Sequence, residues 1–181
     1  MSISKIKEIE NLKVKIDEAI NNNVEILLEK KQQAMEDAFE AFTTLFIEEG
    51  FTIESKNIRE LYTKKARYKN FTISIMTDVD DTSTSFIKQT IAIKSDRFDY
   101  DIAVIWEYND YTEPEKPNSF YEYDDEIDYL RLLLSYHLVE NEKFRAAKPA
   151  YTLYRSEVNE EILRLPRSNS FYDLLKELIQ E

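Results

Sequence analysis

The chain has 181 residues, a formal net charge of −12 at pH 7 and no cysteine. Its length suits one domain with an appended helical arm, and the lack of cysteine excludes disulfides and thiolate metal sites. The negative charge argues against direct binding to nucleic acid, because phosphate contacts require Lys and Arg. With no apolar run near the roughly 18 residues of a membrane span and no apolar signal-peptide core, we expect a cytoplasmic protein without membrane contact.

Residues 2–48 are expected to form helix, since they lack Gly and Pro and place apolar side chains in steps of three and four. Asn21–Asn23 is a candidate point for a bend, and the short apolar seam beyond it favours a helical hairpin or docking arm over a long coiled coil. Gly50 is expected to end the helix. We therefore divide the chain into a helical arm or hairpin, 1–49, and an α+β domain, 50–181. A homodimer through the N-terminal helix is a further expectation.

The α+β domain is expected to open with a helix over 57–68, which lies in a basic stretch of six bases and one acid, Lys56 to Lys69. Alternating apolar residues then predict three strands joined by short connections, hence an antiparallel meander. The apolar faces of these strands are Phe71, Ile73 and Ile75; Ile87, Ile91 and Ile93; and Phe98, Tyr100, Ile102, Val104, Trp106 and Tyr108.

The last third of the chain is expected to contain two more helices and one more strand. A helix over 124–143 places Ile127, Leu130, Leu134 and Leu138 on one stripe, and residues 151–154 are a candidate edge strand. Ser170 has the spacing of a helix cap before a final helix. The predicted fold class is therefore α+β: a long N-terminal helical region, a three- or four-stranded antiparallel meander, and helices packed on one face.

Asp78-Val79-Asp80-Asp81-Thr82 follows the first of the three predicted strands. An apolar strand followed by Asp-x-Asp-x-Thr resembles the first motif of haloacid-dehalogenase-type phosphohydrolases. The resemblance implies a parallel sheet, a bound metal, Asp78 as nucleophile and Asp80 as general acid/base. The alternative is an ordinary polar turn. Short connections favour the turn, because parallel strands need long crossovers. His137, the single histidine, is expected to be structural, and no metal or cofactor is expected.

Acidic residues are concentrated between Asp96 and Asp128, with twelve acids against two bases, and aromatic residues are interleaved among them. Carboxylates can pair with guanidinium groups while aromatic rings bury area and meet cations, so this composition suits a basic protein surface. We call the predicted binding residues the acidic aromatic segment: Glu107, Tyr108, Asp110, Tyr111, Glu113, Tyr121, Glu122, Tyr123, Asp124, Asp125 and Asp128. The opposing interpretation is a solvated acidic loop whose rings fold back onto the sheet.

From these features we expect a non-enzymatic, intracellular inhibitor that covers a basic site on a partner protein. An immunity protein that neutralises a toxin, or an anti-defence protein that mimics nucleic acid in the cleft of a nucleic-acid-binding partner, are concrete forms of this function. Two alternatives remain: an adaptor or chaperone for a secreted protein, and a metal-dependent phosphohydrolase using Asp78 and Asp80.

Overall fold

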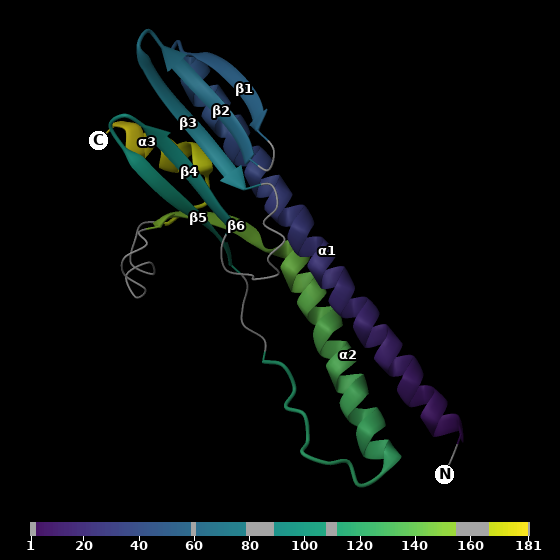
Figure 1. Ribbon diagram of the computed structural model, residues 1–181. Helices are drawn as coiled ribbons and strands as arrows, with labels where there is room; N and C mark the ends of the chain where they lie inside the picture. Colours follow the sequence, from purple (N-terminus) through teal and green to yellow (C-terminus); the bar gives the residue numbers. More distant parts are fainter. Residues whose placement is uncertain (1–2, 59–60, 79–88, 108–111, 155–166, 181) are drawn as a thin grey trace. The chain divides into compact units, whose positions relative to one another are not determined.

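The computed structural model describes residues 3–58, 61–78, 89–107, 112–154 and 167–180. These residues form three helices and a sheet (Figure 1). The elements are α1 (Ile3–Glu48), β1 (Thr52–Ile58), β2 (Leu61–Tyr68), β3 (Phe71–Asp78), β4 (Gln89–Ser95), β5 (Asp99–Glu107), α2 (Tyr123–Ala146), β6 (Lys148–Tyr154), β7 (Arg167–Ser168) and α3 (Phe171–Gln180). The α+β class predicted from the sequence is confirmed.

The chain folds into two compact units, each with its own core. Unit 1 contains residues 1–29 and 108–147, and unit 2 contains residues 30–107 and 148–181. The long helix α1 belongs to both, because it runs through Asn21–Asn23 without interruption and crosses the boundary after Glu29. The units therefore divide the chain at 29/30, 107/108 and 147/148, whereas the sequence analysis divided it at 49/50.

The sheet of unit 2 is an antiparallel meander in which the strands lie side by side in sequence order, β1 to β7. The described residues supply seven strands, rather than the three or four predicted. Two of the additional strands are β1 and β2; β2 lies wholly in the segment expected to be a helix over 57–68, and β1 overlaps that segment only at Asn57 and Ile58. The third is the two-residue strand β7, which pairs with β6 and so removes β6 from the edge.

The expected helix over 57–68 is wrong because the basic residues of β2 alternate between the two faces of a strand. Ala66 is fully buried, and Lys64 on the same face donates from Nζ to Thr43 Oγ1 at 3.0 Å. Lys65 and Arg67 point to the other face and are exposed. Pairing along the full length of β3 outweighs the helix propensity of Lys, Arg and Ala, so tertiary context decides the structure.

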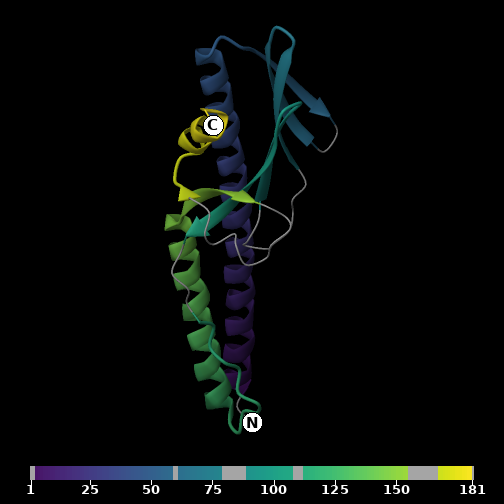
Figure 2. The same cartoon turned by 90° about the vertical axis from the view of Figure 1, so that its left-hand side faces the viewer.

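One face of the sheet forms the core of unit 2, and α3 and the second part of α1 cover it (Figure 2). The Tyr151 ring on β6 meets the Phe171 ring on α3 edge to face, with centroids 5.2 Å apart. The cap predicted at Ser170 is present, since the Asp173 N–H donates to Ser170 Oγ at 3.2 Å. Fully buried side chains from the two layers include Phe42 and Phe46 of α1, Leu175 of α3, and Ile73, Ile75, Ile91, Ile93, Ile102 and Val104 of the sheet.

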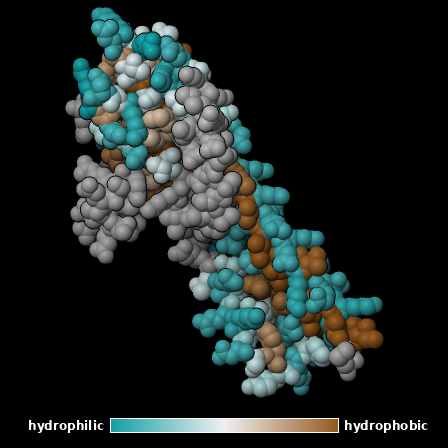
Figure 3. All heavy atoms as spheres, in the orientation of Figure 1, coloured by the Kyte–Doolittle hydropathy of each residue, from teal (hydrophilic) through white to brown (hydrophobic). Residues whose placement is uncertain are grey.

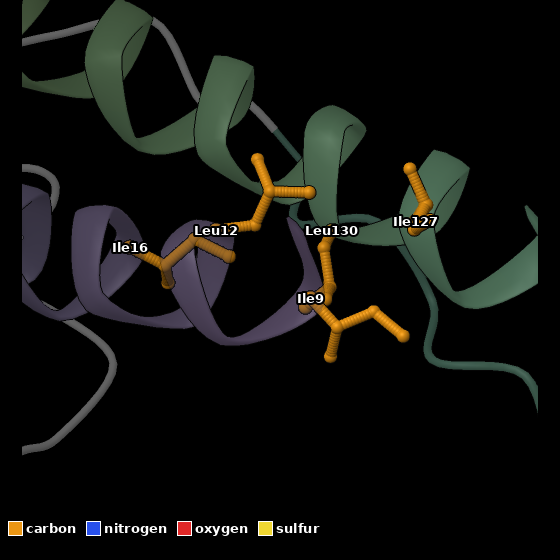
Figure 4. Packing of buried hydrophobic residues seen from close by; sticks show 5 residues of the cluster. All are labelled: Ile9, Leu12, Ile16, Ile127 and Leu130. Atoms are coloured by element: carbon orange, nitrogen blue, oxygen red, sulfur yellow. The ribbon is translucent and has the colours of Figure 1, made fainter. Parts of the chain in front are cut away.

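The core of unit 1 lies between the first part of α1 and α2, which run in the same direction (Figure 1). Figure 4 shows Leu12 of α1 and Leu130 of α2 directed into the space between the two helices. On each helix, one stripe of buried and partly buried residues follows steps of three and four, the spacing of the a and d positions of a coiled coil. This seam consists of Ile9, Leu12, Ile16, Ala19, Asn23 and Ile26 on α1, and Ile127, Leu130, Leu134, His137, Asn141 and Phe144 on α2.

Polar contacts across unit 1 agree with a parallel, in-register coiled coil. In that geometry a residue at position g of one helix meets the e residue of the next heptad of its partner. Glu8 accepts from Arg131 Nη2 at 2.7 Å, and Lys13 Nζ lies 3.6 Å from Glu126 Oε1. Both pairs obey the rule, one on each side of the seam. Unit 1 is therefore a short two-stranded coiled coil made by one chain.

Candidate functional site

The acidic aromatic segment begins at the end of β5 and continues into the first turns of α2. Glu107 is the last residue of β5 and pairs with Lys148 of β6 through the backbone, but its side chain lies outside the described part. Tyr108, Asp110 and Tyr111 also lie outside the described residues. Glu113, Tyr121, Glu122, Tyr123, Asp124, Asp125 and Asp128 are described, and all of them belong to unit 1.

Two acids in the first turns of α2 are paired with cations of the same unit. Lys5 Nζ donates to Asp124 Oδ2, and this hydrogen bond is the main reason that the pKa of Lys5 is raised. Asp128 accepts from Arg131 Nη1 at 3.4 Å. These carboxylates are exposed, so each pair adds little stability, but their charge is already balanced in part by the chain itself.

Glu122 and Asp125 form a reciprocal capping box at the start of α2. The Glu122 N–H donates to Asp125 Oδ2 at 3.2 Å. Acids in the first turn also interact favourably with the helix dipole. Asp125 therefore has a structural role as part of the helix cap.

Among the described aromatic residues of the acidic aromatic segment, Tyr121 is the more exposed, at 91 %. Tyr123 is 40 % exposed, whereas Phe120 is partly buried with its ring centroid 5.6 Å from that of Tyr129. One aromatic side chain of this stretch therefore folds back onto α2, while Tyr121 is directed to solvent. Phe120 packs on Tyr129 of α2, whereas the rings of the opposing interpretation were expected to pack on the sheet.

Glu113 differs from the acids of α2 because its carboxylate forms no ion pair or hydrogen bond with the described residues. The same holds for Glu115, which is also exposed. Between residues 112 and 128 of the described part, the acids without such a contact are thus Glu113 and Glu115, which precede the exposed Tyr121 in the chain. We call Glu113, Glu115, Tyr121 and Tyr123 the acidic loop cluster.

The described side chains of the basic stretch from Lys56 to Lys69 are divided between the two faces of β2 and the turn after it. Arg67 Nη1 lies 3.4 Å from Glu54 Oε1 on the neighbouring strand, and Lys69 lies over the ring of Tyr68. Lys64 is directed toward α1, where Nζ donates to Thr43 Oγ1. Three of the described cations of this stretch, Lys64, Arg67 and Lys69, therefore interact with their own unit.

The Asp78 to Thr82 motif cannot be assembled into a site from the described residues. Asp78 ends β3, but its side chain and the whole of Asp80 lie outside the described part. The described strands are antiparallel to their neighbours, so they do not form the parallel sheet that the resemblance to phosphohydrolases implies. Among the described residues, no three Asp, Glu or His side chains converge in a way that could hold a metal ion.

His137 occupies a d position of the coiled-coil seam and is partly buried. Its Nδ1 atom lies 3.4 Å from Glu140 Oε2, and its ring meets that of Tyr136 edge to face at 5.1 Å. These neighbours belong to the packing of unit 1. His137 is therefore part of the packing between α1 and α2.

Unit 2 contains a largely apolar cavity of about 600 Å³ between the sheet, α3 and the end of α1. The Arg97 guanidinium lies 5.2 Å from the centroid of the Phe71 ring at this site. Sequence periodicity did not indicate the cavity, because its walls come from segments far apart in the chain. The walls are formed by Leu45, Phe46, Glu49, Phe51, Phe71, Ile73, Arg97, Phe98, Tyr100, Lys176, Leu178 and Ile179.

Comparison with family models, with curated proteins and with solved structures finds no match to this chain. No helix among the described residues contains an apolar stretch long enough to cross a bilayer.

Proposed function

We propose that this chain is a non-enzymatic binding protein that uses the acidic loop cluster to cover a basic site on a partner protein. The observation that supports this most directly is Tyr121, which is 91 % exposed within a stretch of carboxylates. A tyrosine can supply a large contact area at low entropic cost and can stack on Arg, while nearby carboxylates pair with guanidinium groups.

The contribution of each residue follows from its own contacts. Tyr121 and Tyr123 are the anchors, because aromatic residues carry much of the affinity of protein interfaces. Glu113 and Glu115 provide long-range attraction and speed of association, because exposed charges affect association rates more than affinity. Asp124 and Asp128 contribute less than the sequence analysis assumed, since Lys5 and Arg131 already balance them.

Inhibition of a toxin or of a defence protein is the concrete form that we favour. Such a partner would present a cleft lined with Lys and Arg, and a negatively charged surface with exposed rings can occupy it in place of nucleic acid. The net charge of −12 agrees with this form, because it disfavours direct binding of the chain to phosphate.

The test is affinity capture from the host with the wild-type chain and two variants that remove two charges each. The site variant carries Tyr121→Ser, Glu113→Gln and Glu115→Gln. The control carries Asp17→Asn and Glu18→Gln, which are exposed acids on α1 in the same unit. We expect the control to retain a partner that the site variant loses, and we expect added duplex DNA to compete with that partner's binding.

The dissociation constant of the purified partner should rise at least tenfold in the site variant, since one anchor tyrosine commonly accounts for about 2 kcal/mol. Binding should also weaken with salt. A partner that binds the site variant and the wild type equally well would refute the acidic loop cluster as the binding surface. Turnover of a phosphate ester that requires Asp78 would instead favour the enzyme alternative.

A further inference from the structure

One flank of α2, beside the coiled-coil seam, carries a second regular stripe of residues. Its residues follow steps of three and four, like the seam itself, and are exposed. We define the outer stripe as Asp128, Arg131, Ser135, Leu138, Glu142 and Arg145. A helix that already buries one stripe in its own unit therefore presents another with the spacing that a coiled-coil partner requires.

The outer stripe has an apolar centre that is open to solvent. Leu138 is 52 % exposed and Leu132, beside the stripe, is 58 % exposed. A shallow groove of about 250 Å³ runs between the side chains at this centre. Figure 3 shows apolar side chains reaching the surface along unit 1 among hydrophilic ones. The groove is lined by Arg131, Leu134, Ser135, Leu138, Val139 and Glu142.

The charges of the outer stripe are arranged symmetrically about a point between Tyr136 and His137. Arg131 and Glu142 are equally far from this point, and so are Asp128 and Arg145, and each pair has opposite charges. The other groove residues follow the same symmetry, since Leu134 corresponds to Val139 and Ser135 to Leu138. Such a stripe is complementary to itself when it is turned end to end.

We propose that the outer stripe of α2 binds the outer stripe of a second copy of this chain, with the two α2 helices antiparallel about a two-fold axis. In that arrangement Arg131 of each copy faces Glu142 of the other, and Asp128 faces Arg145. The small Ser135 faces Leu138 and provides room for its side chain. Every contact then occurs twice, as an isologous dimer interface requires.

The charges also exclude the alternative orientation. A parallel pair of α2 helices would place Asp128 against Asp128, Arg131 against Arg131 and Glu142 against Glu142. Like charges in facing positions oppose association and select against that arrangement. The apolar centre supplies the attraction, and the charged ends determine the direction.

The intrachain contacts of the stripe are compatible with this pairing. Arg131 already donates to Glu8 and Asp128, yet its side chain remains 59 % exposed and can also reach an opposing carboxylate. The stripe covers 18 residues, about 27 Å of helix at 1.5 Å per residue. An interface of this length is small, so we expect a dimer whose population depends on protein concentration. The pairing leaves the acidic loop cluster out of the contact and does not rest on the proposed function.

The first test is the molar mass of the full chain by sedimentation equilibrium over a wide concentration range. We expect the wild type to pass from monomer to dimer. Leu138→Lys should raise the dimer dissociation constant at least about 100-fold, because two leucines lose their burial. Val14→Lys is the control, since Val14 is also exposed on a helix of unit 1 but lies on α1. Circular dichroism should show equal helix content in all three proteins.

The second test uses charge to establish the orientation. Asp128→Arg and Arg145→Glu should each weaken the dimer about tenfold, because two attractive pairs become repulsive. The double variant Asp128→Arg/Arg145→Glu should restore wild-type association, since opposite charges face each other again. A parallel dimer would show no such restoration. The proposal would be overturned if the wild type remained monomeric at every concentration. It would also be overturned if Leu138→Lys left the dimer unaffected. In either case the partner of this face would be a different protein.

Discussion

Gly50 is the single glycine of the chain, and it lies where a helix end requires a left-handed residue. Its φ of +80° directs the chain out of α1, and the Phe51 N–H donates to Phe46 O at 2.8 Å while the Gly50 N–H donates to Ile47 O at 3.0 Å. These are the two hydrogen bonds of a Schellman motif. The rings of Phe46 and Phe51 complete it, with centroids 5.0 Å apart.

Gly50→Ala should lower the free energy of unfolding of unit 2 by about 1 kcal/mol, because an L-residue is strained at positive φ. A Cβ at this position would have no atom within 4 Å, so the cost comes from the backbone alone. In a domain of this size we expect the thermal midpoint to fall by about 2–4 °C.

A substitution at Lys69, in the same unit, is the control, and we expect it to change the thermal midpoint in the opposite direction. Lys69 also has a positive φ, 53°, in the two-residue turn between β2 and β3. Lys69→Gly should therefore raise the thermal midpoint, since glycine relieves that strain. Should Gly50→Ala leave the midpoint unchanged, the left-handed conformation would not be maintained in solution.

The buried phenol of Tyr151 on β6 should make unit 2 less stable at alkaline pH. Burial is the main reason that its pKa rises from 10.0 to about 12, and the charge of Asp37 adds to this effect. The fold therefore favours the neutral phenol. Its contribution is complete below pH 10, where both folded and unfolded chains are protonated, and is lost as the pH rises from about 10 to 12.

We expect the wild type to lose on the order of 2 kcal/mol of stability across this pH range through Tyr151. Denaturant unfolding of the wild type and of Tyr151→Phe, measured from pH 8 upward, will isolate the effect, because the variant lacks the ionising hydroxyl. Tyr172→Phe is the comparison, since Tyr172 is more exposed and should contribute less. Parallel pH profiles for the wild type and Tyr151→Phe would contradict the prediction.

The coiled coil of unit 1 contains a polar layer in which the register places Asn23 opposite Asn141. Asn141 Nδ2 donates to Ala19 O at 3.0 Å, but the buried Oδ1 atoms of both residues have no hydrogen-bond partner among the described residues. A buried Asn at an a position typically lowers stability while it fixes register. This layer is where the helix pair should be least stable.

Replacing both asparagines by leucine should stabilise unit 1 by about 1 kcal/mol or more, because two buried polar groups are removed together. Either single replacement should stabilise unit 1 less than the double replacement does, since it leaves the other amide against an apolar side chain. Chemical denaturation of the four proteins in a double-mutant cycle measures this coupling. Strictly additive effects would show that the two residues do not share a layer.

Sequence periodicity was informative where an element buries one regular stripe. The helix over residues 2–48 and the strands at Phe71 and Phe98 were predicted from such stripes, and the final helix was predicted from the cap spacing at Ser170. Periodicity failed for β2, whose basic side chains are divided between two faces, and it could not show that the stripes of α1 and α2 belong together. Those stripes lie more than a hundred residues apart, as the separation of 119 between Lys5 and Asp124 illustrates.

The same separation limits what sequence can say of the candidate site. Composition located the acidic aromatic segment, but it could not show that Asp124 is paired with Lys5 or that Asp125 caps α2. It also could not distinguish Tyr121, which is exposed, from Phe120, which packs on Tyr129. The residues proposed to bind a partner and the structural residues are of the same types here, and only their contacts separate them.

At the scale of the whole molecule, one helix is shared by two cores. Leu12 belongs to the core of unit 1 and Ile93 to that of unit 2, while α1 contributes residues to both. Cooperative unfolding units tend to follow such cores. The chain should therefore open in two steps, one for each unit.

Native-state hydrogen exchange can test this with two matched truncations. Leu12→Ala should lower the protection of residues 3–29 and 112–146 by about 2–4 kcal/mol, the usual cost of a core cavity, while the amides of β3 to β5 keep theirs. Ile93→Ala should produce the reverse pattern. Loss of protection throughout the chain in both variants would mean that the continuous helix α1 couples the two cores into one cooperative fold. The acidic loop cluster and the outer stripe would then depend on the sheet as well as on the coiled coil that carries them.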